Sequence, residues 1–165
     1  MKLPKLLKKV ALITAPVMFG YLFAGMAFGL MLQNAGYSFV WALLSSIIVY
    51  AGSMQYVLVG LLSAGTGLVS TAVIALAVQI RHAFYGLSLI EQFKNAKKYK
   101  PYLVFALTDE TYSLLCSTKV PEGVCAPRFY FWISLLNQCY WIAGSVLGAT
   151  VGELIAFDTT GVDFA

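Results

Sequence analysis

Apolar residues fill most of this chain in long blocks that short polar segments separate. Five blocks can be delimited, at about residues 11–32, 39–62, 68–90, 102–117 and 129–154. A helix needs about 20 apolar residues to cross the hydrocarbon core of a bilayer. Four of the blocks reach that length, whereas the block at 102–117 is too short for a level crossing. We therefore predict an all-α integral membrane protein that forms one membrane domain over residues 1–165.

The composition agrees with a protein whose partner is the lipid bilayer. Hydrophobic residues make up 60% of the chain and charged residues 11%, whereas about a quarter of the residues of a soluble domain are charged. The net charge of +4 comes from lysines in short clusters beside apolar blocks. Such clusters mark cytoplasmic ends, so we do not expect nucleic-acid binding. Cys116, Cys125 and Cys139 lack Cys-x-x-Cys spacing, so we expect no metal, no disulfide framework and no cofactor.

The amino-terminal residues have an amphipathic pattern. Residues 1–10 place Val10 and several leucines on one helical face and lysines on the others. This pattern is typical of a helix that lies on an anionic membrane surface, so we expect an interfacial helix at 1–10. A cleaved signal peptide is the alternative, with roughly 7–15 apolar residues before its cleavage site. The apolar block continues to Leu32, which favours an uncleaved first span.

The second apolar block is interrupted by the segment Tyr50-Ala51-Gly52-Ser53-Met54-Gln55-Tyr56. Glycine, serine and glutamine near the centre of a span weaken the helix and need hydrogen-bond partners that lipid cannot supply. A discontinuous helix, of the kind with which transporters build substrate sites, is one interpretation. An intact helix with Ser53 bonded to its own backbone is the other, and the sequence leaves both open.

The two lysine clusters bear on the same block. The cluster at residues 1–10 and the cluster at 94–100 should both be cytoplasmic. Three full crossings between them would place them on opposite sides of the membrane. A re-entrant block at 39–62 removes the conflict, so we favour that interpretation.

Ionisable residues are concentrated at one point of the apolar sequence. No charged residue or histidine occurs between Val10 and Ile80, and then Arg81 and His82 follow each other within a span. Charges at such a depth are expected to face a protein interior or a water-filled path. The pair is either part of a transport site or a structural clamp.

Two adjacent carboxylates, Asp109 and Glu110, lie in the short block, and Arg81 is the basic residue of the apolar core that could pair with them. Neighbouring positions of a helix point about 100° apart, so at most one carboxylate is expected to meet Arg81. We propose Asp109 as this partner and Glu110 as a solvent-reaching or proton-carrying group, with the opposite assignment left open.

Small residues recur at four-residue spacing in the first and last spans. They are Gly25 and Gly29 in the first span and Gly144, Gly148 and Gly152 in the last. This spacing lets helices approach closely, so we expect tight helix packing within the chain or with another subunit.

Taken together, several short motifs resemble the AzlC/YgaZ family. They are the first span ending Phe28-Gly29, the segment Tyr50-Ala51-Gly52-Ser53-Met54-Gln55, the segment Arg81-His82-Ala83-Phe84-Tyr85-Gly86, Thr108-Asp109-Glu110, and Trp141-Ile142-Ala143-Gly144. The resemblance implies the large subunit of a two-component exporter in the bacterial cytoplasmic membrane, with leucine, isoleucine, valine and sometimes methionine as substrates. It also implies a small AzlD/YgaH-like membrane subunit as partner.

The chain departs from the family pattern in two ways. Gln79 stands where asparagine is expected before the Arg-His pair. Members of the family usually continue for several tens of residues past the position of Ala165, so we expect a chain truncated at its carboxyl end.

The leading hypothesis is a secondary transporter of zwitterionic amino acids that exchanges them against protons. The candidate substrate-binding residues are Arg81, Asp109, Glu110, Gly52, Ser53, Met54, Gln55, Tyr56 and Phe84, and the candidate proton-coupling residues are His82, Asp109 and Glu110. A carboxylate would receive the amine of the substrate, while Arg81 or backbone amides near a helix break would receive its carboxylate. Histidine is the residue type that titrates nearest physiological pH, which suits His82 to proton coupling. No Gly-x-x-x-x-Gly-Lys loop for ATP is present.

Two rival functions come from other classes. An intramembrane hydrolase would use Ser53 as nucleophile and His82 as base, although the Gly-x-Ser-x-Gly elbow is absent. A non-transporting assembly subunit or fragment would use only the glycine faces. Charges within the apolar core argue against that alternative.

Overall fold

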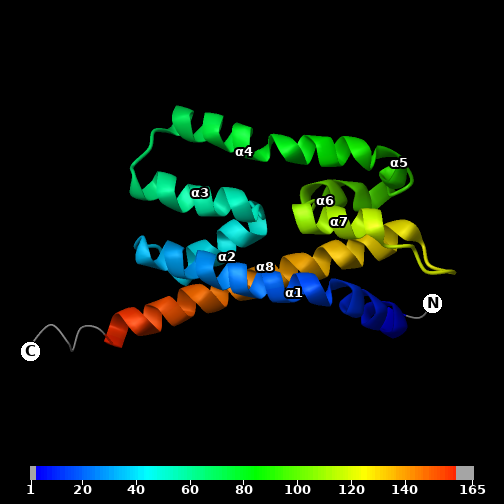
Figure 1. The fold of residues 1–165 in the computed structure, drawn as a ribbon, viewed down its shortest axis with the longest axis horizontal. Coiled ribbons are helices and arrows are strands. Elements are labelled where there is room, and N and C mark those ends of the chain that lie inside the picture. Colours follow the sequence, from blue (N-terminus) through cyan, green and yellow to red (C-terminus); the bar gives the residue numbers. More distant parts are fainter. Residues whose placement is uncertain (1–2, 159–165) are drawn as a thin grey trace, which may run out of the picture.

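The computed structural model describes residues 3–158, a range that is helical apart from short connections and contains no strand. The elements are α1 (Leu3–Asn34), α2 (Phe39–Ile48), α3 (Gly52–Ser63), α4 (Leu68–Ser88), α5 (Ile90–Phe93), the 3-10 turn η1 (Lys97–Tyr99), α6 (Lys100–Phe105), α7 (Asp109–Ser117) and α8 (Ala126–Asp158). Helices α1 and α8 cross along the length of the molecule, and α3, α4, α6 and α7 lie on one side of them (Figure 1). The predicted all-α fold is confirmed.

Glycines allow α1 and α8 to touch backbone to backbone. A side chain at Gly29 would collide with the carbonyl oxygen of Ser145. A side chain at Gly148 would collide with the carbonyl oxygen of Met26. Added Cβ atoms at Gly25, Gly144 and Gly152 would meet the opposite helix at 2.9, 2.7 and 3.2 Å. The small residues thus provide the groove in which the two longest helices pack.

The amino-terminal residues from Leu3 onward belong to α1, so no helix boundary occurs at residue 10. Within the described residues α1 runs without a break from Leu3 past Pro16. Leu6 and Val10 are buried in a cluster that includes Phe93. Part of the apolar face that suggested membrane-surface binding thus packs within the protein.

Two pairs of short helices form hairpins that enter from opposite ends and meet near the centre (Figure 1). One hairpin consists of α2 and α3 with a turn at 49–51, and the other consists of α6 and α7 with a turn at 106–108. Both turns line the same cavity. In each hairpin one half-helix ends and the next begins at the centre, which places free backbone groups there.

The break at 49–51 confirms the interpretation of the second apolar block as a discontinuous helix. Tyr50 at the break has a φ of 41°, in the left-handed region that residues other than glycine rarely adopt. The second break, at 106–108, was not expected, because 102–117 was delimited as a single segment. Thr108 starts α7 there as its N-cap, and its Oγ1 accepts a hydrogen bond from the Thr111 amide at 3.3 Å.

Both lysine clusters lie at the same end of the molecule. The start of α1 and the region of α5 and η1 are at this end, as is the loop between α7 and α8 (Figure 1). The chain reaches this arrangement because α2 and α3 return to the end from which they started. Helices α1 and α4 are each long and apolar enough to cross a membrane, and two crossings between the clusters would place both on one side of it, as the positive-inside tendency expects.

This topology predicts that the α1–α2 and α3–α4 connections face the same side of the membrane. Single cysteines would replace Ser38 and Ala64, both exposed, after the exposed cysteines Cys116, Cys125 and Cys139 have been changed to serine. A membrane-impermeant maleimide should label both new positions from one side. A cysteine at Glu122, in the loop between α7 and α8, should be labelled from the other side. Labelling of positions 38 and 64 from opposite sides would contradict the hairpin.

Candidate functional site

A cavity of about 300 Å³ lies where the two hairpin turns meet. It is lined by Tyr21, Ala24, Tyr50, Ala51, Gly52, Ser53, Tyr56, Arg81, His82, Thr108, Asp109, Glu110 and Trp141. This volume is at the lower end of the range of small-molecule sites. Aromatic rings form much of the wall, charged groups project from the start of α7 and from α4, and the start of α3 adds the hydroxyl of Ser53. This lining suits a small ligand with both apolar and charged parts.

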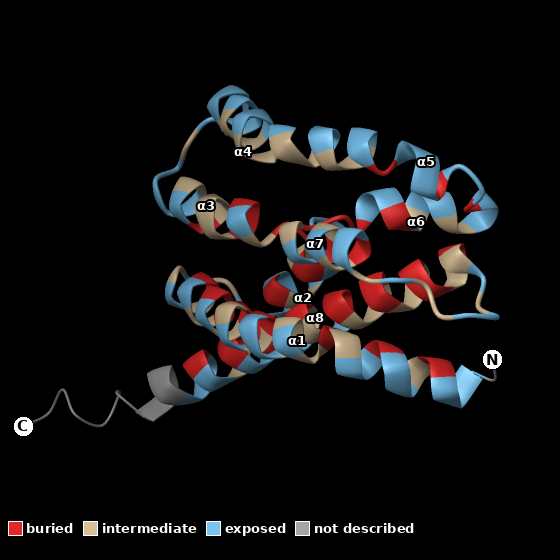
Figure 2. Ribbon diagram, turned by 45° about the vertical axis from the view of Figure 1, so that its right-hand side comes forward, coloured by how far each residue is buried: buried red, intermediate tan, exposed pale blue. Residues whose placement is uncertain are grey.

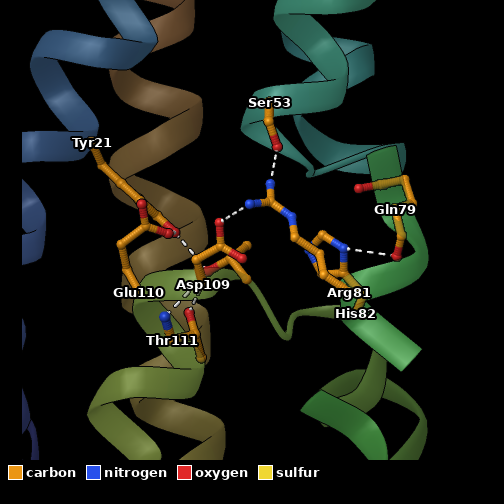
Figure 3. Close-up of polar contacts among 9 residues, drawn as sticks. Tyr21, Ser53, Gln79, Arg81, His82, Asp109, Glu110 and Thr111 are labelled. Carbon is orange, nitrogen blue, oxygen red and sulfur yellow. Dashed lines mark hydrogen bonds and ion pairs between the residues drawn. The ribbon is translucent and has the colours of Figure 1, made fainter. Parts of the chain in front are cut away.

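Arg81 on α4 connects the two half-helices across this cavity (Figure 3). Its Nη1 atom lies 2.6 Å from Oδ2 of Asp109 at the start of α7. Its Nη2 atom donates a hydrogen bond to Oγ of Ser53 at the start of α3. The side chains of Arg81 and Asp109 are 38% and 39% exposed, so the pair is partly open to the surroundings. The guanidinium therefore links α3, α4 and α7 at one point.

The two carboxylates at the start of α7 point to different helices. Asp109 meets Arg81 on α4, whereas Glu110 accepts a hydrogen bond from the hydroxyl of Tyr21 on α1 at 2.8 Å. The same hydroxyl lies 2.6 Å from Oγ1 of Thr108. Both carboxylates occupy the first turn of α7, where the helix dipole favours anions. The contacts agree with the assignment of Asp109, and not Glu110, to Arg81.

The start of α3 exposes uncapped backbone to the cavity. Its N-cap residue is Ala51, which has no side-chain hydrogen bond to offer. The amide of Gln55 bonds to the carbonyl of Ala51 at 2.8 Å, and the preceding amides of the first turn have no partner within an ideal helix. An added Cβ at Gly52 would lie 2.9 Å from the Trp141 ring, so glycine is required for this close approach. The positive end of the α3 dipole thus faces the cavity beside Ser53.

Three of the predicted substrate residues lie outside the lining of this cavity. Met54 is buried behind it. Gln55 is fully buried and bonds to Trp141 and to the serines of α2. Phe84 is 64% exposed on α4 and does not line the cavity. The cavity brings together the other predicted residues, namely Gly52, Ser53, Tyr56, Arg81, His82, Asp109 and Glu110.

His82 and Ser53 both line the cavity but have different partners. Ser53 accepts from Arg81, and Nδ1 of His82 lies 3.3 Å from the carbonyl oxygen of Gln79 (Figure 3). A serine hydrolase needs its nucleophile hydrogen-bonded to the base. Ser53 is instead paired with a permanent cation, an arrangement that does not suit general-base activation.

Six residues that line the cavity were not selected as site residues from the sequence: Tyr21, Ala24, Tyr50, Ala51, Thr108 and Trp141. Thr108 could have been found, because a threonine before Asp-Glu is a signal for a helix start. The aromatic residues gave only a weak signal, since a tyrosine or tryptophan in a span needs a partner for its polar group. Which partner it finds depends on the packing of distant segments.

Comparison with known proteins places this architecture in a family. The model of the AzlC protein family matches residues 16–155. The chain belongs to the AzlC family. No solved structure matches it.

Relatives of the AzlC chain include several membrane proteins. A membrane protein of Helicobacter pylori (strain ATCC 700392 / 26695) is 45% identical over 92% of this chain and 66% of the relative. The branched-chain amino acid transport protein AzlC of Bacillus subtilis (strain 168) is 34% identical over 92% of this chain and 59% of the relative. The inner membrane protein YgaZ of Escherichia coli (strain K12) is 31% identical over 84% of this chain and 58% of the relative. The chain thus spans about two thirds or less of the length of these relatives.

Helix α8 holds the tips of both hairpins in this AzlC chain. Its Asn137 donates to Thr111 of α7 at 3.0 Å. Its Gln138 accepts a hydrogen bond from the Tyr102 hydroxyl of α6 at 2.7 Å and donates one to the carbonyl oxygen of Ile47, near the end of α2, at 3.3 Å. Its Trp141 donates to Gln55 of α3 at 2.8 Å. Buried polar groups that satisfy one another in this way fix the relative position of the elements that carry them.

Replacement of Trp141 by phenylalanine should loosen α3. The change removes the N–H donor and leaves the buried Gln55 oxygen without its partner, which costs about 1–3 kcal/mol. The free energy of unfolding should fall by that amount in a denaturant titration of the purified protein. Trp41→Phe is the matched control, since Trp41 is 56% exposed on α2 and its loss should have little effect. Equal effects of the two changes would show that the hydrogen bond does not hold α3.

Proposed function

We propose that this chain is the transporting subunit of an exporter of branched-chain amino acids in the bacterial cytoplasmic membrane. Leucine, isoleucine and valine are the principal substrates, and methionine is a further one. The observation that carries the proposal is the bridge from Ser53 through Arg81 to Asp109, where two half-helices start in one cavity. The name of the Bacillus subtilis relative, a branched-chain amino acid transport protein, supports the choice of substrate.

The cavity offers each part of a zwitterionic amino acid a complementary surface. Arg81 and the uncapped start of α3 suit a carboxylate, and Asp109 and Glu110 suit an ammonium group. Tyr56, Trp141 and the small residues of the wall suit a branched aliphatic side chain. These three requirements distinguish a hydrophobic amino acid from a sugar, a metal ion or a free fatty acid.

Export is coupled to proton entry in this proposal. His82, Asp109 and Glu110 line the cavity, and side chains of these types form the proton relays of pumps and transporters. The hydrogen bond from Tyr21 connects Glu110 to α1, so a proton gained by this carboxylate would change a contact between helices. A small AzlD/YgaH-like membrane subunit completes the transporter.

The test is leucine efflux from preloaded cells that express this chain together with such a small subunit. The same assay is run on a chain extended at its carboxyl end to the length of the relatives. Efflux from either chain, lost in Arg81→Gln and retained in the surface control Lys94→Gln, supports the proposal. Absence of efflux from both chains, each shown to be in the membrane, contradicts it.

A further inference from the structure

The ion pair between Arg81 and Asp109 has an incomplete geometry. A structural arginine–carboxylate pair is commonly bidentate, with two parallel hydrogen bonds. Here one contact is made, from Nη1 to Oδ2 at 2.6 Å. The Nε atom of Arg81 and the Oδ1 atom of Asp109 are both buried without a hydrogen-bond partner among the described residues. A donor and an acceptor left unsatisfied each cost free energy, which is unfavourable for a permanent clamp.

The two unsatisfied atoms match the head group of an amino acid. A carboxylate can accept from Nε of Arg81, and an ammonium group can donate to Oδ1 of Asp109. The other groups that face this point are Ser53 on α3, His82 on α4 and Glu110 on α7, and Tyr85 on α4 lies beside Asp109. Each of them can also bond to a zwitterion, so the ion pair stands where a substrate head group would find its strongest partners.

The Arg81–Asp109 pair also lies at the end of the α4–α7 contact that has fewer other interactions. None of the described residues of α4 is buried (Figure 2). Further along both helices, Tyr85 stacks on Tyr112 with ring centroids 4.5 Å apart, and Ser88 donates to the Tyr112 hydroxyl at 3.1 Å. These contacts can hold the helices together while the Arg81 end separates.

We propose that the Arg81–Asp109 ion pair is a latch between α4 and α7 that the zwitterionic head group of the substrate opens by taking its place. The carboxylate of the amino acid binds Arg81, and its ammonium group binds Asp109. The empty cavity is closed by the direct pair, and the loaded cavity is bridged by the substrate. The latch rests on the proposed function, and it adds that both charges of the substrate are needed to open it.

Binding of leucine and of two analogues that each lack one charge tests the latch. The analogues are 3-methylbutylamine, without the carboxylate, and 4-methylpentanoate, without the amine, and each competes with radiolabelled leucine on the full chain purified with its small subunit. The wild type should prefer leucine to both. In Arg81→Gln, the ratio of leucine affinity to 3-methylbutylamine affinity should fall at least about tenfold, because the charge-assisted hydrogen bond to the leucine carboxylate is lost. In Asp109→Asn, the ratio of leucine affinity to 4-methylpentanoate affinity should fall equally, because the charge-assisted hydrogen bond to the leucine ammonium group is lost.

Arg128→Gln and Glu122→Gln are the matched controls, because neither residue lines the cavity. They should leave the order of the three ligands unchanged. If leucine binds to the wild type and the order is also unchanged in Arg81→Gln and Asp109→Asn, the latch is overturned and the proposed function stands. If the wild type neither binds nor exports leucine, both are overturned.

A second measurement leaves the ion pair intact and so does not depend on the folding of those variants. Spin labels are attached to Cys116, which is exposed on α7, and to a cysteine at Leu76, which is 73% exposed on α4. The other two cysteines are replaced by serine. Leucine should lengthen the distance between the labels, and the single-charge analogues should not. An unchanged distance at saturating leucine would overturn the latch.

Discussion

A single methyl group added at Gly148 should separate the two longest helices of this protein. The Cβ of Gly148→Ala would overlap the carbonyl oxygen of Met26, and its next contacts are also backbone atoms. A flexible side chain could move away, but a helix backbone can yield only if α1 and α8 move apart. Overpacking of a core costs about 1–3 kcal/mol even where side chains can adjust. We expect a loss of at least about 3 kcal/mol.

The measurement is the free energy of unfolding in a denaturant titration of the detergent-solubilised protein. Gly20→Ala is the matched control on α1, because an added Cβ there has nothing within 4 Å. Alanine also has a higher helix propensity than glycine, so this control should be neutral or stabilising. Similar losses in both variants would mean that α1 and α8 do not pack through Gly148.

Replacement of Arg81 by alanine should destabilise the protein by leaving the Asp109 carboxylate without its cation. At membrane depth an unpaired carboxylate costs about 2.5–3.5 kcal/mol on insertion scales. Because the side chains are 38% and 39% exposed, part of this cost is relieved, and we expect a loss of about 1–3 kcal/mol. The double variant with both Arg81→Ala and Asp109→Ala should regain part of the lost stability, because no unpaired carboxylate then remains.

The double-mutant cycle is measured by unfolding of the four purified proteins. The pair of Glu91 and Lys94 supplies the control cycle, with 3.6 Å between the charged atoms and side chains 69% and 82% exposed. Exposed pairs of this kind contribute little to stability, so that cycle should be additive. Strict additivity for Arg81 and Asp109 as well would exclude a direct interaction between them.

The cavity and its mechanism depend on the same few contacts as the fold. Asn137, Gln138 and Trp141 of α8 hold the turns of both hairpins, while Arg81 joins the helices that start there. Three of these four residues lie on a helix that is fixed by glycine contacts to α1. In the proposed latch, the glycine-packed α1–α8 pair is the support, and α4, none of whose described residues is buried, is the element that moves.

Short-range signals explain what could be predicted from the sequence. Apolar blocks of sufficient length indicated membrane helices, and the Gly-Ser-Gln interruption offered a break in the second block as one of two interpretations, which the structure places at 49–51. The break at 106–108 was missed although Thr108 carries the side chain of a helix N-cap. A capping threonine is also common outside spans, so this signal alone does not identify a turn between two half-helices.

Charge balance allowed one long-range contact to be inferred. An arginine within an apolar segment needs a carboxylate, and the apolar segments offered two adjacent ones, so the pairing of Arg81 with this part of the chain followed from elimination. The choice between Asp109 and Glu110 depended on the rotation of α7, which the packing of Tyr21 and Arg81 on its two sides shows. No pattern within the sequence predicts the rotation of α7 about its axis.

The amino-acid sequence by itself determined the class of the protein, the position of its charges and the small residues at its helix contact, because these depend on composition and on spacing along one helix. Only the tertiary structure decided that two hairpins enter from opposite ends, that Tyr21, Tyr50, Thr108 and Trp141 line their meeting point, and that Phe84 does not line it. The physical reason is that these features arise from contacts between segments far apart in the chain. Such contacts are selected by the packing of whole helices, and a local pattern of residues is compatible with several packings.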